Sequence, residues 1–189
     1  MATEVFKLYP TSAPTTSSHI DGNKAFDRNF DTYARQYSSG SGALLLNNMA
    51  GDAFAPLLSQ GAVITAVRAK VYLSGNASHS LRFVSDASST SKYTDCGDGS
   101  VPFTASTGGN TVDLPGAMTY IKNNPDKLIN NKLGLRLYTQ AKDTYIYEAY
   151  AELEYELPTT SKVYKGTTKQ SVYCGNKKIA TYVGTNKIS

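Results

Sequence analysis

Two long runs of alternating apolar and polar residues constrain the fold of this chain more than any other feature. The first run covers residues 62–73, where Arg68 and Lys70 separate apolar neighbours, and the second covers residues 145–157. A period of two places alternate side chains on opposite faces of a strand, so each run predicts a strand with one buried face. On the expected buried face of the first run are Val63, Thr65, Val67, Ala69, Val71 and Leu73.

The second run is longer than the usual strand of about 3 to 10 residues, so it predicts a β-bulge or two successive strands. Its odd positions, from Tyr145 to Leu157, form the expected apolar face. Its even positions include Glu148, Glu152, Glu154 and Glu156. These glutamates predict a solvated acidic edge, while a carboxylate pair of a glycan-cleaving enzyme stays an alternative because the separation of two carboxylates is a tertiary property.

The rest of the first 158 residues supports an all-β fold. Shorter alternating runs occur at 81–83 and 133–137, and Gly- and Ser-rich turns separate the runs. Only residues 116–124 have the pattern of a short helix, which Pro125 ends. Many strands without alternating helices predict an antiparallel jelly-roll β-sandwich in residues 1–158.

Residues 159–189 form a different segment because they repeat. Tyr-x-Gly recurs every nine residues, with a lysine in the same register of each unit. Each unit reads as a short strand and a turn, so the segment predicts a small C-terminal β-meander. The positions that define this expected assembly segment are Tyr164, Gly166, Tyr173, Gly175, Tyr182 and Gly184.

The same segment carries most of the positive charge of the protein. It contains six lysines and no acidic residue, so it contributes +6 to a net charge of +4 and leaves −2 for residues 1–158. Short strands with few large apolar side chains are marginal alone in water and expose unpaired edges. We therefore expect this segment to pair with another chain, and a solvated basic tail is the alternative.

Composition and motifs argue against several classes of function. There is no long apolar run for a membrane span and no secretory signal, so we expect a protein that starts at Met1 and contacts no membrane. Cys96 and Cys174 lie far apart, which favours a reducing compartment over a disulfide framework. No arginine-rich or catalytic motif occurs, so we expect neither nucleic-acid binding nor catalysis. His19 and His79 are expected in exposed loops.

Residues 25–33, with the sequence AFDRNFDTY, resemble a loop of the galactose-binding-like jelly rolls, the discoidin-type and carbohydrate-binding relatives. In that family the loop and a glutamate near the final strand hold a structural calcium ion. The resemblance therefore implies a calcium site whose oxygen ligands fit the chemistry of that cation. A purely structural alternative has Asp27 and Thr32 only tying the loop by hydrogen bonds. The implied ligands are Asp27, Asn29, Thr32 and Glu152.

The same resemblance implies sugar binding at loops at one end of the sandwich. Trp is absent, so tyrosines are the expected stacking platforms, and basic side chains are the expected hydroxyl donors. Loop tyrosines that serve only as amphipathic surface are the alternative. The candidate glycan-binding residues are Tyr33, Arg35, Tyr37, His79, Arg82 and Tyr93.

A jelly roll followed by tandem Tyr-x-Gly units resembles virion structural proteins of tailed bacteriophages. This resemblance implies a non-enzymatic capsid, tail or baseplate component, assembled in the bacterial cytoplasm and found in the virion. Expected partners are other virion proteins and further copies of the chain, and no cofactor is required for such a role. A carbohydrate-binding module that contacts host-surface glycans is the alternative function.

Overall fold

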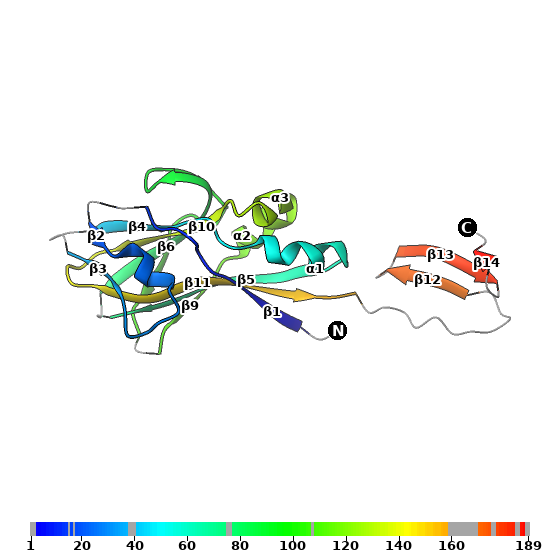
Figure 1. The fold of residues 1–189 in the computed structure, drawn as a ribbon, viewed down its shortest axis with the longest axis horizontal. Helices are drawn as coiled ribbons and strands as arrows, with labels where there is room; N and C mark the ends of the chain where they lie inside the picture. The colour runs from blue at the N-terminus through cyan, green and yellow to red at the C-terminus, as the bar shows by residue number, and fades with distance from the viewer. Residues whose placement is uncertain are drawn as a thin grey trace.

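The computed structural model is a two-sheet β-sandwich followed by a small third sheet (Figure 1). It describes residues 3–14, 16, 18–37, 41–74, 77–106, 108–158, 170–174, 177–183 and 186–187, with only the backbone in the last three ranges. All strand pairs are antiparallel, and the predicted all-β sandwich is confirmed.

The first sheet is built around its long final strand, β11. Its spatial order is β2-β3-β11-β5-β9, and β1 also pairs with β11. Because β5 occupies one side of β11, β1 and β3 share the other side at different points along it. The strands are β1 (Thr3–Leu8), β2 (His19–Ile20), β3 (Ala34–Gln36), β5 (Val63–Leu73), β9 (Asn110–Asp113) and β11 (Tyr145–Glu156).

The second sheet has the order β4-β10-β6-β7, with β8 also paired to β6. Its strands are β4 (Gly42–Leu46), β6 (Ser78–Ser89), β7 (Lys92–Asp95), β8 (Val101–Thr104) and β10 (Leu133–Thr139). The connections β3–β4, β4–β5, β5–β6, β8–β9, β9–β10 and β10–β11 each cross from one sheet to the other. This alternation agrees with the predicted jelly roll, although the finer topology stays a prediction.

The hydrophobic core fills the space between the sheets, and short helices close part of its rim (Figure 1). The helices are η1 (Gly22–Phe26), η2 (Asp52–Phe54), α1 (Ala55–Ser59), α2 (Pro115–Asn123) and α3 (Pro125–Ile129). The predicted helix before Pro125 is therefore confirmed, and the same proline begins the next helix. The largest buried side chains include Phe54, Phe83, Leu81, Leu114, Ile121 and Leu133.

Two irregularities in the β5–β11 pairing confirm the expected bulge and correct the predicted faces. Tyr147 has no partner in the register, so the buried residue at that end of β11 is Ile146 and not Tyr145 or Tyr147. At the other end of the β5–β11 pairing, Thr65 of β5 has no partner in the register. Because a bulge changes which face a side chain occupies, Ile64 is buried there, whereas Val63 and Thr65 are exposed.

The third sheet is an antiparallel meander in the order β12-β13-β14, as predicted for the C-terminal segment. Its strands are β12 (Gln170–Cys174), β13 (Lys177–Val183) and β14 (Asn186–Lys187), and they pair with no strand of the sandwich among the described residues. Tyr173 lies in β12 and Tyr182 in β13. The other predicted assembly positions, Tyr164, Gly166, Gly175 and Gly184, lie outside the described residues.

The bulge at Thr65 makes a testable prediction about two adjacent residues. Ile64 is 4% exposed and Val63 is 55% exposed. We expect Ile64→Ala to lower the free energy of unfolding by about 2–4 kcal/mol through lost packing. The matched change Val63→Ala is expected to alter it by less than about 0.5 kcal/mol. Urea unfolding of both variants measures the difference, and the reverse order would contradict the observed register.

Candidate functional site

The loop that resembles the calcium loop is closed by its own polar groups. Asp27 Oδ1 accepts a hydrogen bond from the Asn29 backbone N–H at 3.0 Å, and Asn29 Oδ1 accepts one from the Asp31 N–H at 3.0 Å. The Thr32 hydroxyl lies 2.6 Å from Asp27 Oδ2 and 2.9 Å from the Asn29 carbonyl oxygen. These contacts agree with the structural alternative for Asp27 and Thr32, and they also bring together several hard oxygen atoms.

Aromatic contacts hold this loop against the outer face of the first sheet. Arg28, whose φ is +61°, places its guanidinium carbon 4.1 Å from the centroid of the Tyr9 ring. Phe30 meets Tyr72 edge-to-face, with ring centroids 5.1 Å apart. Tyr72 is the β5 partner of Glu148 in β11. The loop therefore lies over Glu148, held by one aromatic contact at each side.

Glu148 is the most unusual ionisable side chain of this site. It is 2% exposed, and neither carboxylate oxygen has a hydrogen-bond partner of normal geometry within the described part of the chain. Burial raises the pKa of Glu148 to about 7; the nearby Arg28 main chain lowers it in part and the Asp27 carboxylate raises it. Burial of a charged carboxylate without such a hydrogen bond costs free energy, so we expect Glu148 to hold a proton or to bind a cation.

These observations correct two predictions about the glutamates of β11. β11 is an internal strand, so its glutamates do not form a solvated edge. Glu152, the predicted calcium ligand of this strand, pairs with Lys70 at 3.8 Å instead. The glutamate that the structure places beside the loop is Glu148 and not Glu152. In the sequence, Glu148 is marked only by its even position in the alternating run 145–157, and Glu152 has an even position too.

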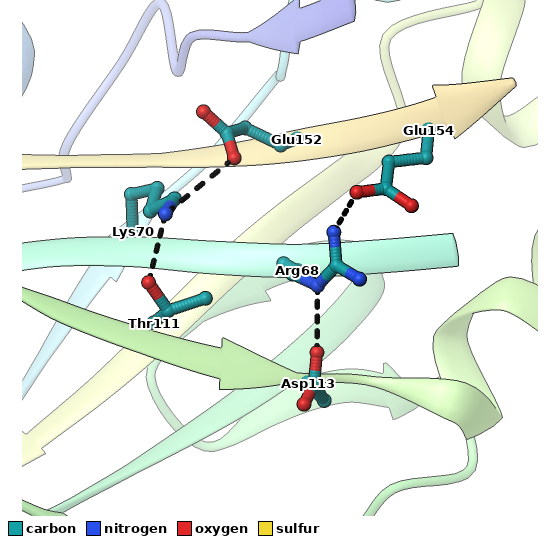
Figure 2. A network of polar contacts seen from close by, with 6 residues as sticks. All are labelled: Arg68, Lys70, Thr111, Asp113, Glu152 and Glu154. Carbon is teal, nitrogen blue, oxygen red and sulfur yellow. Dashed lines mark hydrogen bonds and ion pairs between the residues drawn. The ribbon is translucent and has the colours of Figure 1, made fainter. Parts of the chain in front are cut away.

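Glu152 belongs to a polar network across three strands of the outer face (Figure 2). Lys70 reaches Glu152 on β11 and the Thr111 hydroxyl on β9, the latter at 2.8 Å. Arg68 pairs with Glu154 on β11 and with Asp113 on β9, where Nε and Oδ1 are 2.8 Å apart. Because each cation of β5 lies between two partners, this network ties β11, β5 and β9 together.

The six predicted glycan-binding residues do not form one site. Tyr33 directly precedes β3 and packs on Tyr145, with ring centroids 4.7 Å apart, and Arg35 lies in β3 and pairs with Asp143. Arg82 and Tyr93 lie on the outer face of the second sheet, with the Arg82 guanidinium carbon 5.7 Å from the centroid of the Tyr93 ring. Arg82 also pairs with Asp95. The sequence could not predict this separation, because it does not show that the two pairs of residues belong to different sheets.

Both histidines are buried, which corrects the expected exposed loops. His79 is 1% exposed, packs near Phe103, and faces the core from β6, so it cannot bind a glycan at the surface in this conformation. Burial lowers its pKa. His19 is 3% exposed, with Nε2 3.1 Å from the Thr139 hydroxyl and Nδ1 3.0 Å from the Ser18 hydroxyl. Burial lowers the pKa of His19 to about 4.

Two open clefts lie near the start of β4. The Tyr37 cleft has a volume of about 420 Å³, and its walls include Thr16, His19, Ile20, Asp21, Asn23 and Tyr37. The Tyr138 cleft has a volume of about 470 Å³, and its walls include Tyr138 and hydroxyl-bearing residues. Pro14 and Thr16 line both clefts, so the two adjoin. Of the predicted glycan residues, only Tyr37 lines either cleft.

No protein-family model matches this chain, and a search of curated proteins finds no match to its sequence. Within the described residues, no helix is long and apolar enough to cross a membrane. In the same residues, no three His, Cys, Asp or Glu side chains gather into a metal-binding group. A cation beside Glu148 would therefore also need amide, hydroxyl or main-chain oxygens of the loop.

Burial of His19 predicts a loss of stability on acidification. Its folded pKa of about 4 lies below the ordinary histidine value of 6.5, so the unfolded chain binds the extra proton between these values. The contribution of His19 is therefore lost as the pH falls from about 6.5 to 4, by about 3 kcal/mol at most. Urea unfolding at a series of pH values should show this loss in the wild type relative to His19→Gln.

The difference between the two proteins isolates His19 from other titrating groups. Glu148 acts in the opposite direction, because its raised pKa means that the folded state holds the extra proton between about 4.5 and 7. His79 acts in the same direction as His19. Parallel pH profiles for the wild type and His19→Gln would contradict the assignment of a buried, neutral His19.

Proposed function

We propose that this protein is a non-enzymatic structural component of a bacteriophage virion, a capsid decoration or a tail or baseplate protein, that assembles through its C-terminal β segment. The observation that carries the proposal is the third sheet, whose three short strands pair only with one another among the described residues. Such a sheet leaves a backbone edge on each side, and open edges are templates for pairing with another chain.

The chemistry of the segment supports an assembly role. Two of its strands have five and two residues, and a sheet of this size is marginal alone in water. Pairing with a neighbour would add hydrogen bonds and bury side chains. Its six lysines suit it to less basic protein surfaces, including residues 1–158 of another copy, which carry −2.

The proposed partners are other virion proteins and further copies of this chain, with no contact to nucleic acid or membrane and no catalysis. The proposed location is the virion, after assembly in the bacterial cytoplasm. The phage resemblance of the two-part sequence motivates this assignment, and the sandwich with its appended sheet is compatible with it.

Disruption of the third sheet tests the assembly role. Ala180 pairs with Val172 across β12 and β13, and proline there removes a backbone donor from the central strand. We expect Ala180→Pro to abolish self-association, or binding to purified capsid or tail proteins, in sedimentation experiments. A chain that ends at Pro158 is expected to do the same and to keep the far-ultraviolet circular dichroism of the sandwich.

A variant that removes charge but keeps the backbone donors separates this role from that of a solvated basic tail. Lys177→Gln combined with Lys178→Gln removes two charges without removing a backbone donor. If the association depends on strand pairing, this double variant keeps it at 0.5 M salt, where surface charges are screened over about 4 Å. If the double variant loses the association and Ala180→Pro keeps it, the basic-tail interpretation replaces ours.

A second candidate function is carbohydrate binding, and the Tyr37 cleft favours it. Tyr37 is 42% exposed and supplies an aromatic surface, while Asp21 and Asn23 supply a carboxylate and an amide. An apolar ring beside a few hydrogen-bonding groups is the usual composition of a small-ligand site. A sugar offers hydroxyls for the polar groups and C–H faces for the ring, so a host-surface glycan would suit this cleft.

We further propose that the loop over Glu148 binds calcium. The orphaned carboxylate of Glu148, the Asp27 carboxylate and the loop oxygens of Asn29 and Thr32 are the hard ligands that this cation prefers. Bound calcium would add its positive charge to that of Arg28 near the buried carboxylate, and so would lock the loop onto the first sheet. The role of the cation would be structural.

Melting temperatures with calcium and with a chelator test this site. Ligand at 100 times its dissociation constant stabilises a folded protein by about 2.7 kcal/mol. We expect such a calcium-dependent gain in the wild type, none in Glu148→Gln, and an undiminished gain in Glu152→Gln. A gain that survives in Glu148→Gln but disappears in Glu152→Gln would restore Glu152 as the ligand, and no gain in the wild type would exclude the site.

A further inference from the structure

The Tyr138 cleft is built by a hairpin that folds over the second sheet. In the β6–β7 hairpin the register shifts between Ser85 and Ser89, and Asp86 has a positive φ of 50°. These features bend the arm back, so that Thr90 in its turn accepts a hydrogen bond from Arg136 Nε on β10 at 2.7 Å. One wall of the cleft is therefore the hairpin tip, and another is the start of β4.

The walls of this cleft are rich in hydroxyl groups. Each hydroxyl both donates and accepts hydrogen bonds, so such a wall complements a ligand that carries many hydroxyls itself. Tyr138 adds the one aromatic ring among the described wall residues. Its hydroxyl donates to Ser41, which holds the ring in place. The hydroxyl-bearing residues besides Tyr138 are Thr16, Ser18, Ser41, Ser88, Ser89 and Thr90.

A cation stands directly beside the cleft. The Arg136 guanidinium lies between two tyrosine rings, 5.7 Å from the centroid of Tyr138 and 5.6 Å from that of Tyr93. Its cross-strand neighbour on β6 is Arg82, which pairs with Asp95 at 2.9 Å. No carboxylate pairs with Arg136 in the part of the chain that the structure describes. Of these two opposed arginines only Arg82 pairs with an acid, so the Arg136 end of the cleft keeps a positive charge.

The opposite end of the cleft opens toward the Tyr37 cleft, with which it shares Pro14 and Thr16. The two clefts present a tyrosine each, and they differ in charge, since Asp21 lines the Tyr37 cleft whereas Arg136 stands beside the Tyr138 cleft. A ligand longer than one sugar unit could contact both clefts. Its acidic end would then lie at the Tyr138 cleft, beside Arg136, and not at the Tyr37 cleft, beside Asp21.

We propose that the Tyr138 cleft binds an acidic saccharide, with the carboxylate of the sugar at the Arg136 end and its ring against Tyr138. This proposal rests on the second candidate function, carbohydrate binding, and adds a site and a ligand class to it. Arg136 is pre-positioned by its tyrosine neighbours and by Thr90, so little side-chain freedom is lost when it pairs with a carboxylate. A neutral sugar would leave this charge without a partner.

The test uses the full-length protein, an array of uronate-, sialate- and neutral-terminated glycans, and a matched pair of ligands. The pair is the best acidic binder and its methyl ester, in which the carboxylate charge is removed and the sugar rings are kept. We expect isothermal titration calorimetry to show about tenfold tighter binding of the acid. This preference should weaken as the salt concentration rises.

Four variants, one of them a control, test the roles of the charge and of the ring. Arg136→Gln is expected to bind the acid and its ester equally, and Tyr138→Ala to weaken the binding of both. Lys122→Gln, an exposed residue of α2 outside both clefts, removes the same charge and should leave both affinities unchanged. Arg136→Lys, which keeps the charge, should retain part of the preference if Arg136→Gln fails to fold.

The outcomes separate this proposal from the function on which it rests. Equal binding of acid and ester by the wild type, or an unchanged preference in Arg136→Gln, overturns the assignment of an acidic ligand while carbohydrate binding stands. Binding that depends on Tyr37 but not on Tyr138 moves the ligand to the Tyr37 cleft and overturns the site. No binding of any glycan overturns both the site and the carbohydrate-binding candidate, and leaves the assembly role untouched.

Discussion

Backbone pairing along β11 is the constraint on which the rest of the sandwich depends. This strand has β5 on one side and both β1 and β3 on the other, so it holds the first sheet together along its whole length. Its inward side chains, such as Leu153, pack into the core, and its outward glutamates meet Lys70 and Arg68. The candidate calcium site also depends on it, since β11 places Glu148 under the loop.

The sequence predicted the strands well because their alternation is local. The two long runs became β5 and β11, and the helix before Pro125 was also correct. The positions of the bulges could not be predicted, because a bulge is visible only in the pairing of two strands distant in sequence. Residues at the strand ends, such as Val63 and Tyr145, were therefore assigned to the wrong face.

The candidate site was less predictable, because burial there comes from distant segments that cover a strand. Glu148 and Glu152 have the same parity on β11, yet only Glu148 lies under the loop. His79 followed a turn-like segment in the sequence but faces the core in β6. The Tyr138 cleft was missed because its walls come from four separate parts of the chain, none of which carries a motif.

β11 is the last strand of the sandwich in sequence but an internal strand of its sheet, and this also decides how the molecule bears mechanical load. Thr3 pairs with Glu156, so the first strand of the chain and the last strand of the sandwich run side by side in opposite directions. A pull on the segment after Glu156, along the axis of β11, would stress the hydrogen bonds to β5 and β1 together and not one after another. An anchor attached through this strand would resist shear, whereas a pull across the sheet would peel it open.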